Sequence, residues 1–287
     1  MSKKVAVAIT LVIGIGVAVA ANSMREKPCR PSTTRSCAKD TYGSDAPELI
    51  ADGNEIGAGS VKTELAHLPN PDYEDHLPKF IQADFIELDK IGSISLFRSG
   101  VGHDSTENPG IGETCRSKKH YFSPTMEARG GWEADRARKA LDEAGKPVPP
   151  PDDELAAKVY SPVDGVVTTV ASTHWGLEIA IRPNSEPDFL IRISHVFPYP
   201  DIEEGVSVAA GQRIAYTANC TDMVIEWNGG SNSNERVYLV SYFSVMPDSV
   251  FAAYQARGAK SREQLVVSRE WRDAHPFECV GTEFAED

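Results

Sequence analysis

The chain has 287 residues, long enough to bury a sizeable core, and its 41% hydrophobic and 25% charged residues are typical of a globular protein. Its formal net charge of −13 repels nucleic-acid phosphates and anionic lipid headgroups, so we expect no nucleic-acid partner.

The first residues have the three-part pattern of a secretory signal. Lys3 and Lys4 form a basic start, Val5–Ala21 is apolar, and Ala18-Val19-Ala20 supplies the small residues of a cleavage site. We therefore expect residues 1–21 to be a signal peptide and the rest of the chain to be periplasmic or secreted. An uncleaved N-terminal anchor is the alternative, because the 17 residues of Val5–Ala21 are at the lower limit for spanning a bilayer. Membrane contact is expected only through that segment.

Five cysteines follow this segment. In an oxidising compartment some of them should form disulfides. Cys29 and Cys37 are a local candidate pair, and a longer link could join two of the remaining three, Cys115, Cys220 and Cys279. The odd number leaves one thiol free or intermolecular.

Composition divides the rest of the chain into a linker and a folded part. Residues 22–75 are rich in Ser, Thr, Gly, Pro and Asp without a sustained period, which predicts a flexible linker. Residues 76–287 form the predicted domain, which begins with strand-like alternation over Phe80–Phe97. Within it, residues 126–151 combine helical spacing with a Pro-rich stretch, which predicts a helical insertion and a stiff spacer.

The second half of the predicted domain is rich in short strands. Val159–Trp227 contains runs of Val, Ile and Leu between turn residues, a pattern typical of a small barrel or sandwich. In the C-terminal extension, residues 237–287, we expect a strand over Tyr238–Met246 and helices over Phe251–Arg257 and Ser261–Asp273, the last capped by its own first residue. The predicted fold class is mainly β, with a barrel-sandwich core, an inserted helix and C-terminal helices.

Three segments of the β-rich region carry a more specific signal. Ser161–Val167 (SPVDGVV) is a predicted strand–turn–strand with Asp-Gly in the tight turn, and Gly205–Ala215 (GVSVAAGQRIA) repeats that pattern. Between them, Ile191–His195 (IRISH) is a predicted strand that ends in histidine. In this order the segments resemble the core of the LytM/lysostaphin-type zinc metallopeptidases, a barrel-sandwich fold known as the duplicated hybrid motif. The resemblance covers roughly residues 97–105 and 159–228.

Biotinyl and lipoyl carrier domains share part of this pattern, but they need a lysine in an exposed hairpin to carry the cofactor. Val159–Trp227 contains no lysine. We therefore exclude a carrier function.

The family resemblance implies a zinc site made from an H-x-G-x-D motif and the second histidine of a late H-x-H motif. Gly100–Asp104 (GVGHD) matches the first motif except that Gly100 replaces the histidine. Asp222–Glu226 (DMVIE) stands at the place of the second motif, with Asp222 at the general-base position and Val224 at the ligand position. Because valine has no lone pair for a metal, we expect the family's metal site to be degenerate and no cofactor to be bound.

An altered zinc site is the alternative. His103 and Asp104 are its candidate ligands, and His195 and Asp222 could join them, since imidazole and carboxylate suit Zn²⁺. The candidate catalytic residues of such a site are His195, Asp222 and Glu226. The ordinary interpretations are that His195 closes its strand by bonding to backbone and that Asp104 caps the following turn.

A basic cluster, Arg116, Lys118 and Lys119, precedes His120 in this acidic chain. A solvated loop is the ordinary interpretation of these residues, and a binding site for an anionic group that includes His120 is the functional one. His120 could instead supply a further nitrogen to a metal.

We therefore expect an exported, non-catalytic relative of the LytM peptidases. Its expected partner is peptidoglycan, bound through glycan or peptide, or an envelope protein. One alternative is an active zinc-dependent peptidoglycan endopeptidase with altered ligands. Another is a structural envelope protein that assembles through Val237–Asp287.

Overall fold

The computed structural model describes residues 76–105, 113–125, 127–128, 154–173, 176–218, 220–228, 237–281 and 283–284, and the strand backbone at 41–43 and 50–51. The predicted signal peptide 1–21, the Cys29–Cys37 pair, most of the predicted linker 22–75 and nearly all of the predicted insertion 126–151 lie outside these residues. Within the linker stretch, the two short strands are paired with each other and with the folded part, which the sequence did not predict.

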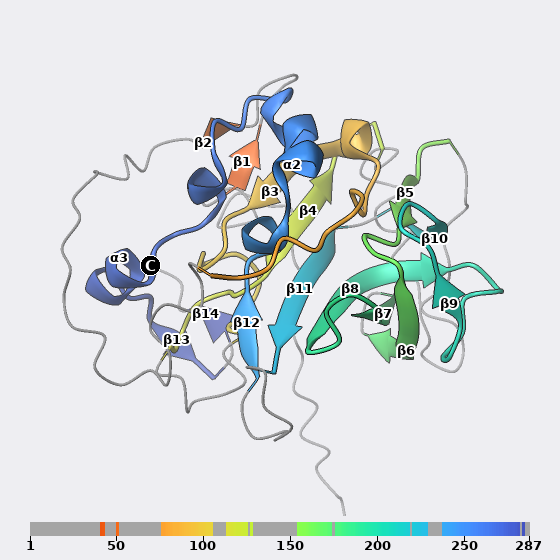
Figure 1. Ribbon diagram of the computed structural model, residues 1–287. Coiled ribbons are helices and arrows are strands. Elements are labelled where there is room, and N and C mark those ends of the chain that lie inside the picture. The colour runs from red at the N-terminus through yellow and green to blue at the C-terminus, as the bar shows by residue number, and fades with distance from the viewer. Residues whose placement is uncertain are drawn as a thin grey trace, which may run out of the picture.

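Antiparallel strands are the main regular structure of the described chain and helices are few, so the predicted mainly-β class is confirmed (Figure 1). The strands are β1 (Thr41–Gly43), β2 (Ile50–Ala51), β3 (Ile91–Ser95), β4 (His120–Pro124), β5 (Ala157–Tyr160), β6 (Gly165–Thr173), β7 (Gly176–Pro183), β8 (Phe189–Pro198), β9 (Ser207–Val208), β10 (Arg213–Thr217), β11 (Thr221–Trp227), β12 (Tyr238–Val240), β13 (Cys279–Val280) and β14 (Glu283–Phe284).

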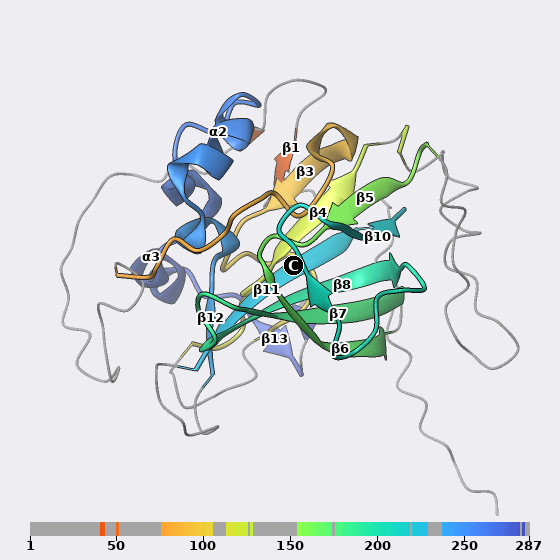
Figure 2. The same cartoon turned by 45° about the vertical axis from the view of Figure 1, so that its right-hand side comes forward.

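The main sheet has the strand order β2-β1-β3-β4-β11-β8-β7-β6-β9, and β12 pairs with β11. Strand β8 also pairs at its far end with β10, which in turn pairs with β5. Figure 2 shows the β5–β10 pair beside β8. This arrangement places β8 and β11 at the centre of the structure, where side chains from several strands can meet.

The two segments that carried the family resemblance fold back on each other, as predicted. Gly165 at the start of β6 pairs with Val208 of β9, and Ser161 exchanges backbone hydrogen bonds with the turn before β10. The Asp164 carboxylate accepts a hydrogen bond from the Ala210 amide at 2.8 Å, which ties one turn to the other. A Cβ on Gly165 would lie 2.6 Å from the Arg182 carbonyl oxygen, so only glycine fits the tight approach.

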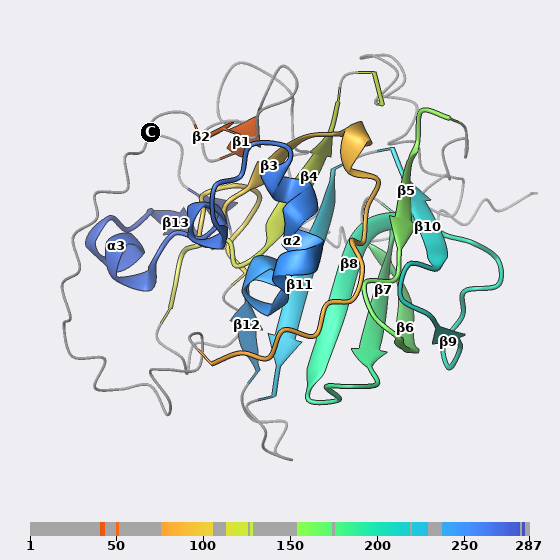
Figure 3. The same ribbon diagram turned by 45° about the horizontal axis from the view of Figure 1, so that its top comes forward.

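Short helices lie in the C-terminal part of the chain: the 3₁₀ helices η3 (Tyr242–Val245) and η4 (Arg262–Leu265) and the α-helices α2 (Asp248–Gln255) and α3 (Arg269–Ala274). A further 3₁₀ turn, η1 (Leu88–Lys90), precedes β3. Figure 3 shows α2 over the part of the sheet formed by β3, β4 and β11. None of the described helices has the length and apolar character needed to cross a membrane.

Several predicted boundaries are wrong. The Phe80–Phe97 strand is reduced to β3, and the Tyr238–Met246 strand ends at Val240, because Ser241 accepts a hydrogen bond from the Phe243 amide and starts a 3₁₀ turn. The last helix starts at Arg269 with Ser268 as its cap, whereas Ser261 makes no side-chain cap bond to η4. At Ser241 and Ser268 a serine hydroxyl bonds to nearby backbone and sets the boundary, which a hydrophobic pattern does not record.

An aromatic cluster joins the C-terminal helices to the sheet. Phe85 packs edge-on against Phe122 of β4 and against Tyr242, at centroid distances of 4.7 and 5.5 Å. Phe243 packs edge-on against Tyr254 of α2 at 4.9 Å. All five rings are buried, and edge-to-face pairs contribute about 0.5–1.5 kcal/mol each beyond area burial. The C-terminal extension is therefore part of the main core.

Candidate functional site

A β-bulge in β8 brings His195 to the centre of the site. Between β7 and β8 the register shifts from Leu177↔Val196 to Ile179↔Ile193, so β8 contains an extra residue. His195 takes up this bulge with a left-handed backbone, φ 61°, which is uncommon for a residue other than glycine. The Thr221 and Thr217 hydroxyls donate hydrogen bonds to the Ser194 and His195 carbonyls, at 2.6 and 2.9 Å, and hold the bulge in place.

Asp222 of β11 lies directly beside this bulge. Its side chain is 0% exposed, yet Oδ2 lies 3.3 Å from His195 Nε2 and 3.5 Å from Lys119 Nζ. Neither carboxylate oxygen has a hydrogen-bond partner of ordinary geometry among the described residues. Burial on its own raises the pKa of Asp222, but Lys119, His195 and His103 overcome that effect and hold the pKa well below its usual range.

Lys119 connects this carboxylate to His103. Lys119 Nζ lies 3.3 Å from His103 Nε2, and His103 Nδ1 lies 3.0 Å from the Asp104 carbonyl oxygen. Because a carbonyl oxygen only accepts, Nδ1 carries the proton and Nε2 accepts from the lysine ammonium. We call the four side chains His103, Lys119, His195 and Asp222 the ionic cluster. Its buried carboxylate is covered by Lys119 and His195, whose side chains are 16% and 20% exposed.

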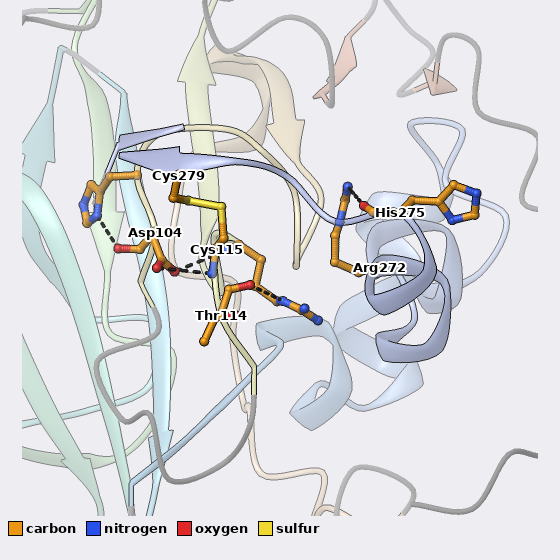
Figure 4. The surroundings of a disulfide bond; sticks show 8 residues. Asp104, Thr114, Cys115, Arg272, His275 and Cys279 are labelled. Atoms are coloured by element: carbon orange, nitrogen blue, oxygen red, sulfur yellow. Dashed lines mark hydrogen bonds between the residues drawn. A yellow bond between two sulfur atoms is a disulfide. The ribbon is translucent and has the colours of Figure 1, made fainter. Parts of the chain in front are cut away.

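Asp104 is turned away from the ionic cluster. Its carboxylate oxygens accept hydrogen bonds from the backbone amides of Cys115 and Arg116, both at 3.2 Å (Figure 4). Asp104 thus closes a turn through backbone contacts. Its proposed partners in an altered zinc site, His195 and Asp222, contact each other without it.

The C-terminal segment fills the space at Gly100, where the family motif has a histidine. A Cβ on Gly100 would lie 2.8 Å from Phe277 Cζ, so a larger side chain would displace that ring. Phe277 stacks on the Arg272 guanidinium at 3.8 Å, and the Cys115–Cys279 disulfide fixes the segment nearby (Figure 4). This disulfide is the longer link predicted from the sequence, and Cys220 is the free cysteine among the described residues.

The residues at the expected ligand positions do not fit a zinc ion. Gly100 and Val224 have no donor atom, Val224 is buried, and the Asp104 carboxylate is occupied by backbone amides. Over the described ranges, no group of three or more His, Cys, Asp or Glu side chains has the spacing to hold a metal. The polar atoms of His103, Asp104, His195 and Asp222 therefore do not converge on a common point.

The predicted solvated loop is wrong for Arg116 and Lys118, which are buried. The Glu113 carboxylate, 2% exposed, accepts from Lys118 Nζ at 3.0 Å, from Arg116 Nη1 at 3.3 Å and from Arg98 Nε at 2.7 Å. Arg116 also pairs with Asp273 at 2.7 Å. Because their charges are engaged inside the protein, these two residues do not form an anion-binding surface together with Lys119.

His120 and Glu226 are also engaged elsewhere. His120 is buried between the Ser95 carbonyl, 2.9 Å from Nδ1, and the Ser241 hydroxyl, 2.7 Å from Nε2, and burial lowers its pKa to about 4. Glu226 accepts from Arg192 Nε at 2.6 Å on the face of the sheet. The structure places neither residue in the ionic cluster.

Sequence reasoning did not identify Lys119 as the partner of Asp222, nor Glu113 as the anion of a buried network. No sequence pattern separates the two lysines, which lie between the bridge at Ser117 and the start of β4 at His120. Lys118 and Lys119 contact different carboxylates, Glu113 and Asp222.

Comparisons with known proteins find partial structural matches. No protein-family model matches the chain, and no curated protein does. The catalytic domain of the antimicrobial peptidase lysostaphin from Staphylococcus simulans aligns at 21% identity over 29% of this chain and 65% of that one, with a TM-score of 0.23. A putative glycyl-glycine endopeptidase LytM from Ruminococcus gnavus aligns at 19% identity over 42% and 48%, with a TM-score of 0.27.

A third structure, Csd3 from Helicobacter pylori, aligns at 11% identity over 61% of this chain and 39% of that one, with a TM-score of 0.31. The chain spans less than two thirds of the length of each of these solved chains. At these TM-scores the alignments establish neither a shared overall fold nor a shared activity, so no family is assigned.

Proposed function

We propose that the protein is a non-catalytic, LytM-like domain that acts outside the cytoplasm and binds cell-wall material through the surface around the ionic cluster. The proposal rests on the residues that occupy the expected metal site. Glycine and valine stand at two ligand positions, the aspartate at the third accepts from backbone amides, and a lysine lies among the remaining polar groups.

Two features support location outside the cytoplasm. The N-terminal sequence has the pattern of a secretory signal. The Cys115–Cys279 disulfide joins residues separated by 164 positions, and structural disulfides persist chiefly in oxidising compartments.

The partly exposed Lys119 side chain of the ionic cluster favours a ligand that offers oxygen acceptors. Lys119 and His195 lie beside a carboxylate that is 0% exposed, and His195 Nδ1 is itself buried, so the Lys119 ammonium is the donor through which the cluster would meet a ligand. Amide carbonyls, carboxylates and sugar hydroxyls, which the glycan and peptide parts of peptidoglycan supply, are suitable partners for such donors.

Sedimentation with purified peptidoglycan sacculi tests the proposal, together with an assay for released muropeptides. We expect the protein to pellet with sacculi and to release no muropeptides with zinc or with EDTA. His195→Ala should weaken pelleting, whereas His76→Ala, at an exposed position, should not. Zinc-dependent release of muropeptides would overturn the non-catalytic assignment, and failure of the wild-type protein to pellet would overturn the ligand class.

A further inference from the structure

We propose that the Lys119 ammonium is the permanent cation of the ionic cluster and takes the place that a divalent metal ion would need. Lys119 lies just before β4, His195 is in the bulge of β8, and Asp222 is on β11. Three separate parts of the chain thus supply one buried anion and the nitrogens around it.

The distances within the ionic cluster show that the Lys119 ammonium lies where a metal ion would bind His195 and Asp222. His195 Nε2 and Asp222 Oδ2 are 3.3 Å apart. Two ligand atoms at about 2.0–2.1 Å from a tetrahedral zinc ion lie about 3.4 Å from each other. This pair therefore has a spacing suited to a metal, but Lys119 Nζ lies 3.5 Å from the same Oδ2 atom and 3.3 Å from His103 Nε2.

Charge makes the lysine and a metal mutually exclusive. A fully buried carboxylate needs a cation close by, because a buried charge left without a partner is strongly destabilising. Lys119 supplies that charge within the chain. A divalent ion bound to the same Asp222 oxygen would place two cations within a few ångströms of each other, and their repulsion disfavours its binding.

The substitution has a chemical consequence. An ammonium group donates hydrogen bonds to carbonyl or carboxylate oxygens, but it has no vacant coordination position and does not turn a bound water into hydroxide, as zinc does. A centre built on Lys119 can hold a ligand oxygen without activating water. This role of Lys119 rests on the same metal-free site as the proposed function, but metal affinity tests it separately from binding to the cell wall.

Metal titration of the full chain after EDTA treatment tests this role, with Co²⁺ absorption and Zn²⁺-dependent thermal unfolding as readouts. The wild-type protein should show no Co²⁺ binding that depends on Asp222, judged against Asp222→Asn. Lys119→Met, which removes the charge and keeps most of the side-chain volume, should bind Co²⁺ and Zn²⁺ at least tenfold more tightly than wild type. Adding Asp222→Asn to that variant should abolish the gain.

Two controls keep the result interpretable. Lys260→Met removes an exposed ammonium and should leave metal binding unchanged. Lys119→Arg keeps a cation and should behave as the wild type, which provides a comparison if Lys119→Met does not fold. Asp222-dependent Co²⁺ binding by the wild type or by Lys119→Arg would overturn the proposal, as would a folded Lys119→Met protein with unchanged metal affinity.

Discussion

Replacing Glu113 by glutamine removes the anion of the buried network at almost constant volume. Glu113 Oε2 lies 2.7 Å from Arg98 Nε and 3.3 Å from Arg116 Nη1, and Oε1 lies 3.0 Å from Lys118 Nζ. Three cations thus surround one carboxylate that is 2% exposed, and Asp273 offers a second, partly exposed carboxylate to Arg116. The variant leaves these buried cations facing a neutral amide.

The expected loss is about 3–5 kcal/mol of unfolding free energy at pH 7, the usual cost of removing one partner from a buried ion pair. Glutamine fills the same space, so no cavity contributes. Glu203→Gln, at an exposed position, is the matched control and should change the free energy by less than about 0.5 kcal/mol. Urea denaturation followed by fluorescence measures both variants.

The pH dependence provides a second test. Burial on its own raises the pKa of Glu113, but Arg98 and Lys118 overcome it and hold the pKa well below its usual range. A carboxyl with a depressed pKa in the folded state stabilises the protein above its ordinary pKa of 4.5, and that stabilisation is lost as the pH falls further. The wild type and Glu113→Gln should therefore converge in stability at acidic pH. A difference below about 1 kcal/mol at pH 7, or one that does not shrink in acid, would refute this explanation.

Burial raises the pKa of Asp84 to about 6 from 3.8, so its contribution to stability is complete below about pH 3.8 and is lost as the pH rises through 6. As the pH rises from 4 to 7.5, the unfolding free energy of Asp84→Asn should increase by up to about 3 kcal/mol relative to that of the wild type. An equal difference in unfolding free energy between the two proteins at both pH values would contradict this. The double variant Cys115→Ser/Cys279→Ser should lose about 2–5 kcal/mol in urea denaturation, because the disulfide closes a long loop, and no loss would show that other contacts hold the C-terminal segment. Gly102→Ala should lower the melting temperature more than Gly205→Ala. Both glycines have positive φ, but a Cβ at Gly102 would also lie 2.2 Å from a tyrosine hydroxyl, whereas Gly205 has open space. Equal effects would show that the tyrosine moves freely.

Local features of the fold could be predicted from the sequence because their physical causes are local. The Asp164-Gly165 turn follows from residue types that tolerate a tight backbone, and the short apolar runs of Val159–Trp227 form β5 to β11 as expected. The predicted long disulfide was left open among three cysteines, since cysteine spacing does not specify which pair approaches in space. The structure selects Cys115 and Cys279.

The sequence by itself determined the mainly-β class, the paired turn segments and the absence of side-chain donor atoms at Gly100 and Val224. Tertiary structure alone decided the partners of the charged residues, because residue type and spacing do not specify which side chains approach each other in space. Lys118 pairs inside with Glu113 while Lys119 reaches Asp222, more than a hundred residues away in the sequence.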